Sequence, residues 1–192
     1  MRKIEKSRLV IAVVIMSLAL LPSAGGTAQE KSKRETFQAV ARGQSTQSGR
    51  MFHVNIIVNE YSTPEEQLAL LEAFNSEGME GLSNTLSKMK AKGRLSIPGT
   101  VGYDVTYIRS FPTETGRKIR LVTSRPITIG EARAGSRSSD YSLSAIELNL
   151  SNEKGKSTGI LLPACQFKID KERQLEIENY QNPWKLQNIL ER

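Results

Sequence analysis

Four charged side chains lie close together in the stretch SRPITIGEARAGSRSSDYSLSAIELNL, between two apolar alternating runs. They are Glu131, Arg133, Arg137 and Asp140. In one interpretation the stretch is a structural corner, where an arginine pairs with a carboxylate through the parallel hydrogen bonds that its planar guanidinium favours. In the other, the two arginines bind an anionic or hydroxylated ligand and Tyr141 stacks against it. The charges balance, whereas a site for anions would have uncompensated arginines, so the corner is favoured.

The same two carboxylates are the first candidates for catalysis. Glu131 and Asp140 would divide acid and base roles in a hydrolase that acts on an envelope or extracellular polymer. Nothing in the sequence sets the separation of the two carboxylates, so this activity ranks below a non-enzymatic function.

One histidine and one cysteine limit the other catalytic and metal sites that the chain could form. Strand alternation places His53 on the polar side of its segment, beside Asn55, as a solvated side chain. Cys165 shares an apolar side with Phe167 and Ile169, so we expect a buried, unreactive thiol. The sequence contains no glycine-rich phosphate loop, Walker-type lysine or Asp-x-Asp calcium loop. We therefore expect no catalytic constellation, no cofactor and no metal site.

The first 28 residues have the pattern of a secretory signal peptide. A basic start precedes the uncharged run LVIAVVIMSLALL, and small residues follow at Ala24 and Ala28, near which we expect cleavage. The run is shorter than the ~20 residues of a membrane-spanning helix, and no cysteine follows it to carry a lipid. The pattern predicts a periplasmic or extracellular protein without a stable membrane anchor, in which residues 29–34 form a flexible leader.

The charge of the remaining chain argues against nucleic acid as a partner. Residues 1–28 carry four basic side chains and one acidic one, so their removal lowers the formal charge from +7 to +4. Aromatic residues make up only 6% of the sequence and do not alternate with arginines, as they do in nucleic-acid-binding surfaces. The partner is therefore expected to be a protein or a small molecule.

Residues 35–192 are predicted to form a single β-rich domain. ETFQAVARG (35–43) and MFHVNIIVNEY (51–61) read as a hairpin around a polar loop. The stretch VGYDVTYIR alternates next, and Val101, Tyr103, Val105 and Tyr107 are expected on one face. Later alternating segments lie at 117–123, 146–150, 161–169, 175–177 and 185–190.

Between the first hairpin and the later strands, the hydrophobic period changes to that of a helix. Thr63 or Ser62 can cap a helix that starts at Pro64, and carboxylates occupy its first turn. The spacing of leucines and methionines predicts two short helices, near 63–75 and 78–91, separated at Gly78. The expected fold class is thus α+β, a mostly antiparallel sheet curled into a sandwich or barrel with an inserted pair of short helices.

Four stretches carry a resemblance to a known group of proteins. YSTPEEQLALLEAF, IPGTVGYDVTYIR, SRPITIGEARAGSRSSDYSLSAIELNL and IDKERQLEIENY resemble, in this order, a family of small uncharacterised exported proteins of soil bacteria. The similarity extends over nearly all of the chain that follows the signal peptide. It implies bacterial export and a shared β-rich domain, and it supplies no catalytic residues because the family has no assigned activity.

These patterns favour an exported, non-enzymatic binding or structural module. An alternative is a carrier of a small apolar ligand inside the barrel, lined by Tyr103, Tyr107 and Trp184. Core packing alone also accounts for these aromatic residues. The hydrolase ranks third.

Overall fold

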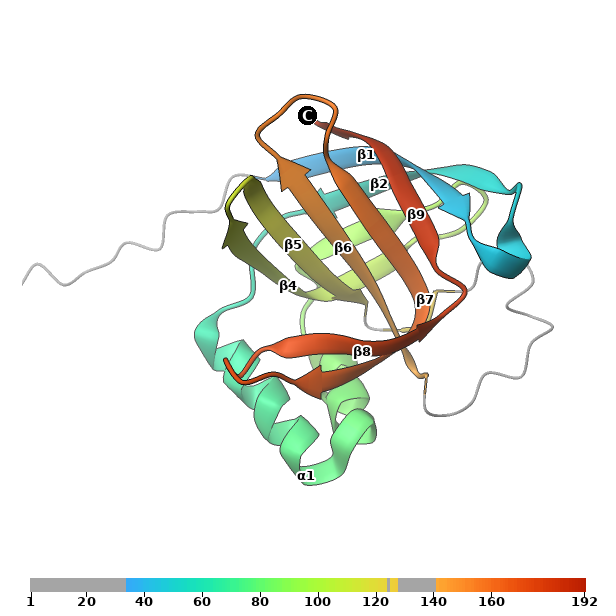
Figure 1. Ribbon diagram of the computed structural model, residues 1–192. Coiled ribbons are helices and arrows are strands. Elements are labelled where there is room, and N and C mark those ends of the chain that lie inside the picture. The colour runs from blue at the N-terminus through green and yellow to red at the C-terminus, as the bar shows by residue number, and fades with distance from the viewer. Residues whose placement is uncertain (1–33, 124, 128–140) are drawn as a thin grey trace, which may run out of the picture. The chain divides into compact units, whose positions relative to one another are not determined.

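The computed structural model describes residues 34–123, 125–127 and 141–192 (Figure 1). The predicted signal peptide, the predicted leader apart from Arg34, and the site candidates Glu131, Arg133, Arg137 and Asp140 lie outside the described residues. The described part belongs to one compact unit, in agreement with the single β-rich domain that the sequence predicts.

Nine strands, one α-helix and one short 3-10 helix make up the described part of the chain (Figure 1). In chain order they are β1 (Glu35–Gly43), η1 (Ser45–Gln47), β2 (Met51–Val58), α1 (Pro64–Lys88), β3 (Gly93–Ser96), β4 (Tyr103–Thr113), β5 (Gly116–Thr123), β6 (Leu143–Ser151), β7 (Thr158–Ile169), β8 (Leu175–Gln181) and β9 (Trp184–Glu191).

Eight of the strands form a closed antiparallel barrel. Their order is β6-β5-β4-β3-β2-β1-β9-β7, and a further pairing of β6 with β7 closes the ring. Closure removes the unpaired edges that an open sheet of this size would expose. The predicted curled antiparallel sheet is thus confirmed, in its barrel form.

The ninth strand, β8, extends the barrel wall beyond the ring. Gln181 pairs with Ala164 of β7, and Trp184 of β9 pairs with Leu161 in the same register. Strands β8 and β9 therefore run along one edge of β7 as a single interrupted strand. The interruption is an elbow at Asn182, whose φ of 48° is in the left-handed region, where asparagine is tolerated better than most residues.

A cluster of twenty buried side chains fills the inside of the barrel. They alternate along each strand, as in Phe37, Ala39 and Ala41 of β1 or Val54, Ile56 and Val58 of β2. In β1 and β2 the alternating residues face outward and are less buried, so these strands are amphipathic.

An irregularity in β4 corrects one of the expected faces. The register shifts between Val105 and Tyr107, so Val105 and Ile108 both point into the barrel and Tyr107 points outward. Such a bulge reverses the alternation of every residue that follows it. The expectation that Tyr107 shares a face with Tyr103 and Val105 is wrong, and Val101, which is 79% exposed, precedes the strand.

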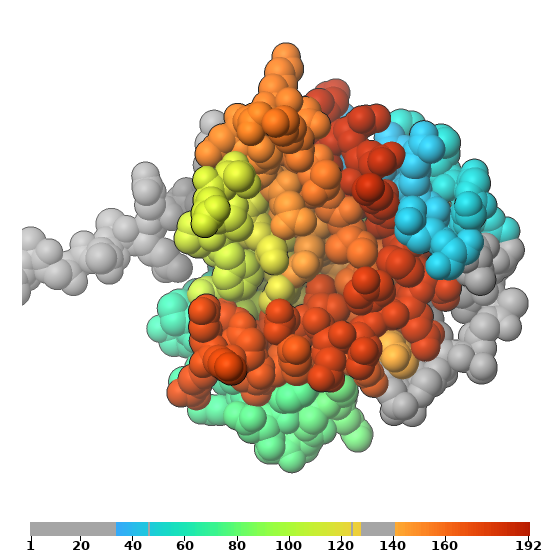
Figure 2. All heavy atoms as spheres, in the orientation of Figure 1, coloured from blue at the N-terminus to red at the C-terminus, as the bar shows by residue number. Residues whose placement is uncertain are grey.

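Helix α1 covers the outside of the barrel and creates a second core. Its leucines 70, 71, 82 and 86 are buried against outward-facing side chains of β4 to β7, including Tyr107, and against Leu175 of β8. In Figure 1 the β7–β8 hairpin crosses the other strands between the barrel and the helix. The space-filling view shows the hairpin as a continuous band there (Figure 2).

A single helix replaces the two that the sequence predicts. Gly78 has non-helical angles (φ 62°, ψ −141°), so the predicted break is present as a kink, but the helical element continues from Pro64 to Lys88 across it. Helical hydrogen bonding resumes immediately, because one glycine can absorb the kink without an intervening loop. The predicted helices near 63–75 and 78–91 are thus confirmed only in part: the break lies at Gly78, but the two segments form one kinked element that ends at Lys88.

The start of the helix has the expected cap. Thr63 accepts a hydrogen bond from the Glu66 backbone N–H, and the Glu66 carboxylate accepts one from the Thr63 N–H (2.8 Å). The buried Lys92 ammonium lies 2.9 Å from Glu66 and 3.2 Å from Glu60. Burial alone would lower the pKa of Lys92, but these carboxylates outweigh it and raise the pKa. The lysine thus ties the helix cap to the end of β2.

Polar side chains close one end of the barrel. By strand alternation Glu35 and Arg117 share the interior faces of β1 and β5, and the guanidinium holds both carboxylate oxygens, at 2.6 and 3.3 Å. The Tyr61 hydroxyl donates to Glu35 (2.9 Å) and accepts from Arg117 (3.2 Å). Burial and the Glu35 carboxylate raise the pKa of Tyr61.

The hydroxyl of Tyr107 provides a contrast, because it is buried and has no hydrogen-bond partner among the residues that the structure describes. We expect Tyr61→Phe to lower the free energy of unfolding by about 1–2 kcal/mol, since it removes hydrogen bonds to two charged groups. Tyr107→Phe, the same chemical change, should be neutral or stabilising. Urea unfolding at neutral pH measures both. Equal losses in the two variants would contradict this description of the barrel end.

The raised pKa values also fix the sign of an alkaline effect. The pKa of Tyr61 is higher in the folded state than in the unfolded state. Its contribution to the free energy of unfolding is therefore complete below the unfolded pKa of about 10, and it declines as the pH rises through the folded pKa. Burial raises the pKa of Tyr107 to about 12, with the same sign. Stability should therefore fall above pH ~10, and less steeply in either phenylalanine variant.

Candidate functional site

The stretch singled out in the sequence begins with a structural anchor at the other end of the barrel. The Arg125 guanidinium lies 4.7 Å from the centre of the Tyr103 ring and donates to the Gly102 carbonyl (2.8 Å). Ile127 is fully buried in the barrel core, and its N–H donates to the Ser144 hydroxyl (2.7 Å). These contacts hold the start of the stretch in place.

The five predicted site residues are not brought together in the described structure. Tyr141 is half-buried just before β6, and the other four lie outside the described residues. The corner, the ligand site and the hydrolase built on Glu131 and Asp140 therefore all stay predictions.

The three aromatic residues proposed to line an interior cavity divide between two cores. Tyr103 and Trp184 belong to the barrel interior, where Trp184 packs against Phe52 with ring centres 4.7 Å apart. Tyr107 lies in the second core, outside the barrel. The predicted cavity lining is therefore wrong for Tyr107, because of the bulge in β4.

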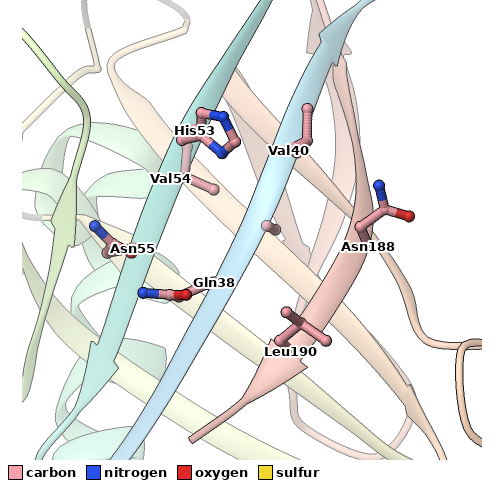
Figure 3. Close-up of a pocket in the computed structure, with 8 residues that line it drawn as sticks. Gln38, Val40, His53, Val54, Asn55, Asn188 and Leu190 are labelled. Carbon is pink, nitrogen blue, oxygen red and sulfur yellow. The ribbon is translucent and has the colours of Figure 1, made fainter.

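A groove on the outside of β1, β2 and β9 contains the single histidine. Its walls also include Gln38, Val40, Asn55, Asn188 and Leu190 (Figure 3). We call the hollow that these residues line the bulge groove. Its volume is about 400 Å³, which is within the usual range of small-ligand sites. His53 is exposed on the outer face of β2, as the alternation predicts.

Strand pairing arranges the groove in two rows. Asn55 and Leu190 are both cross-strand partners of Gln38, which lies between them. His53 pairs with Val40 in the next row. Directly paired side chains on one face stand about 5 Å apart, so each row can contact one ligand.

An irregularity in β9 creates the third wall. Gln38 pairs with Leu190 and Val40 with Gln187, so one residue of β1, Ala39, opposes two of β9, Asn188 and Ile189. Asn188, whose φ is 53°, has the irregular backbone conformation of this bulge. Because Ile189 packs against the barrel core, Asn188 and Leu190 are both left to line the groove.

The polar side chains of the bulge groove have unused hydrogen-bonding groups. Among the residues that the structure describes, the side chains of Gln38, His53, Asn55 and Asn188 make no hydrogen bond and no ion pair. Amide groups both donate and accept, and the imidazole adds a further nitrogen. Leu190, 58% exposed, and Val40 supply apolar surface beside them. This arrangement suits the hydroxyl-bearing part of a ligand.

A second groove of about 580 Å³ lies on the neighbouring face. Its lining includes Ile160 of β7, Lys185 of β9, and Tyr180 and Pro183 on either side of the elbow. Tyr180 is 50% exposed and offers an aromatic wall.

Part of the bulge groove could be found from the sequence. Alternation alone places His53 and Asn55 on the outer face of β2. Gln38 and Asn188 join them only through the pairing of β1 with two neighbours and through the bulge, and no local signal in the sequence marks either.

Comparisons with protein-family models, with curated proteins and with solved structures give no match. Within the described ranges, no helix has the length and apolar character needed to cross a bilayer. The same residues contain no group of three histidine, cysteine or acidic side chains placed to hold a metal ion.

Cys165 is buried, as the sequence predicts, and its thiol lies 3.5 Å from the Leu143 carbonyl. Burial, together with the charge of Glu147, raises the pKa of the thiol. Since the thiolate is the reactive form, we expect an aromatic disulfide reagent to leave native Cys165 unmodified at pH 8 and to modify it fully in urea. Rapid reaction of the folded protein would show that the thiol is accessible.

Proposed function

We propose that the chain is an exported, non-enzymatic binding module whose ligand lies in the bulge groove. The observation that carries the proposal is the row Asn55–Gln38–Leu190 with His53 beside it, in which polar side chains without internal partners surround a hollow in a rigid wall. Export rests on the amino-terminal pattern of the sequence.

The barrel supports a site of this kind because it holds the side chains still. At the groove, β1 is paired along both edges, with β2 and with β9, so the groups need little ordering when a ligand binds, and less affinity is lost to entropy. Strand-borne sites are also more precise than sites on loops.

The chemistry of the groove favours a ligand whose part inside the groove is uncharged and rich in hydroxyl groups, such as an oligosaccharide. Carboxamides can donate to one hydroxyl oxygen and accept from the next hydroxyl. No Asp, Glu, Lys or Arg side chain lines the bulge groove, so a ligand in this groove would not face charge repulsion or a buried unpaired charge.

A carrier of a small apolar ligand is the second candidate, and the closed eight-stranded barrel is the observation that favours it. Bulky side chains occupy the described interior, among them Phe37, Ile56 and Trp184. A ligand there would have to displace them, so we rank this candidate below the outer groove.

Titration calorimetry of the full chain with cellohexaose, maltohexaose and N-acetylchitohexaose tests the proposal. We expect at least one of these neutral probes to bind. The double substitution Gln38→Ala with Asn55→Ala should weaken that binding about tenfold or more, since two hydrogen bonds contribute roughly 1–3 kcal/mol together.

The matched control removes two exposed amides elsewhere, by Asn84→Ala on α1 and Asn152→Ala after β6. It should leave the affinity within about twofold. Failure of all three probes to bind, or equal affinity in the groove variant and the control, would contradict the proposal.

A further inference from the structure

Two cations face each other at the edge of the bulge groove. Arg42 of β1 and Lys185 of β9 are direct cross-strand partners, and both are exposed. Like charges in this position repel each other and destabilise the pairing. Neither side chain forms an ion pair with any described residue.

Three other cations of the barrel strands have a carboxylate partner, whereas Arg109 of β4 and Lys118 of β5 form no ion pair with a described residue. Arg94 pairs with Asp104 at 2.9 Å and Arg117 with Glu35 at 2.6 Å. Arg120 pairs with Glu147 at 2.5 Å. Arg42 and Lys185 differ from these three in that they face each other without a carboxylate partner among the described residues, and both are exposed, so an external anion can reach both groups.

The backbone beside the pair is held in a strained conformation. Ser45 has φ 52° and Asn182 has φ 48°, and the Gln44 N–H donates to the Pro183 carbonyl (3.2 Å), which joins the two segments. Residues in such conformations persist where the surroundings fix them, and they cluster at functional sites. Lys185 also lines the second groove, and Arg42 lines a small adjoining hollow of about 240 Å³.

We infer that Arg42 and Lys185 bind a carboxylate of the ligand, which makes that ligand an acidic oligosaccharide. This inference rests on the proposed function of the bulge groove. Arg42 follows Gln38 by four residues on the same outer face, which is about 13 Å along the strand. One extended ligand can thus place hydroxyl groups against the amides and an acidic group against the cations.

The uncharged amides next to the cations are the reason to choose a polysaccharide among anionic polymers. A nucleic acid would require cations that follow its phosphates and aromatic side chains on which its bases stack. The bulge groove supplies amides, an imidazole and aliphatic side chains instead. These groups match hydroxyl groups that lie between widely spaced acids.

The test compares two forms of one probe by calorimetry of the full chain. Hexagalacturonate carries carboxylates, and its fully methyl-esterified form keeps the hydroxyl groups but has no charge. We expect the acid to bind about tenfold or more tightly than the ester. Raising the salt concentration from about 50 to 500 mM should reduce that advantage, because exposed charges are screened.

The double variant Arg42→Gln with Lys185→Gln should lose at least about tenfold in affinity for the acid and keep its affinity for the ester within about twofold. Its thermal stability should equal or exceed that of the wild type, because the repulsion is gone. The control Lys154→Gln with Lys171→Gln removes the same charge from exposed turns, and it should retain the preference for the acid.

Several results would overturn the inference. Equal affinity for acid and ester would refute the acidic class, while binding of the ester that is lost in the Gln38/Asn55 variant would leave the proposed function standing. Inorganic phosphate that binds as tightly as the hexamer would show a site for small free anions instead. A nucleic acid that binds more tightly than the acid, through the same two cations, would identify a different polymer.

Discussion

The two edges of β7 hold the barrel together. One edge pairs with β6 and the other with β9. Because β9 also pairs with β1, β7 connects β6 to the opposite end of the strand order and closes the ring. The pairing with β6 is a local hairpin, whereas the pairing of β9 with β1 joins residues far apart in the sequence, such as Phe37 and Glu191, so the ring closes only when most of the other strands are in place. Because β7 extends beyond its pairing with β9, its second half pairs with β8. The second core under α1 includes side chains of this β7–β8 hairpin.

The extension divides the outside of the barrel into two kinds of surface. On one side the β7–β8 hairpin and α1 bury Tyr107, Leu143 and Phe167 in a second core. Arg120 is also covered there, where it pairs with Glu147 and donates to the Leu175 carbonyl. On the other side β1, β2 and β9 keep an outer face whose polar groups have no partner in the described protein. The covered side stabilises the fold, and the open side is where we place binding.

Local patterns in the sequence predict the elements well and their relations poorly. Alternation locates the hairpin of β1 and β2 and the helix start at Thr63, since each depends on neighbouring residues alone. It fails at Tyr107 and gives no indication of Asn188, because a single extra residue in a strand reverses all later faces without changing the composition. The kink at Gly78 is visible in the sequence, but whether a kink or a loop follows depends on packing against the hairpin. For the candidate site, His53 and Asn55 follow from periodicity, whereas their meeting with Gln38 and Asn188 follows from long-range strand pairing.

Backbone chemical-shift mapping by NMR is the most direct test of where a ligand binds. Full-length, isotopically labelled protein would be titrated with hexagalacturonate, and the amide shifts of the barrel, the helix and the hairpin would be followed together. The account predicts shift changes confined to β1, β2 and β9, strongest from Gln38 to Arg42 and from Lys185 to Leu190. Changes centred on the barrel interior or on α1, or no change at saturating probe, would contradict it.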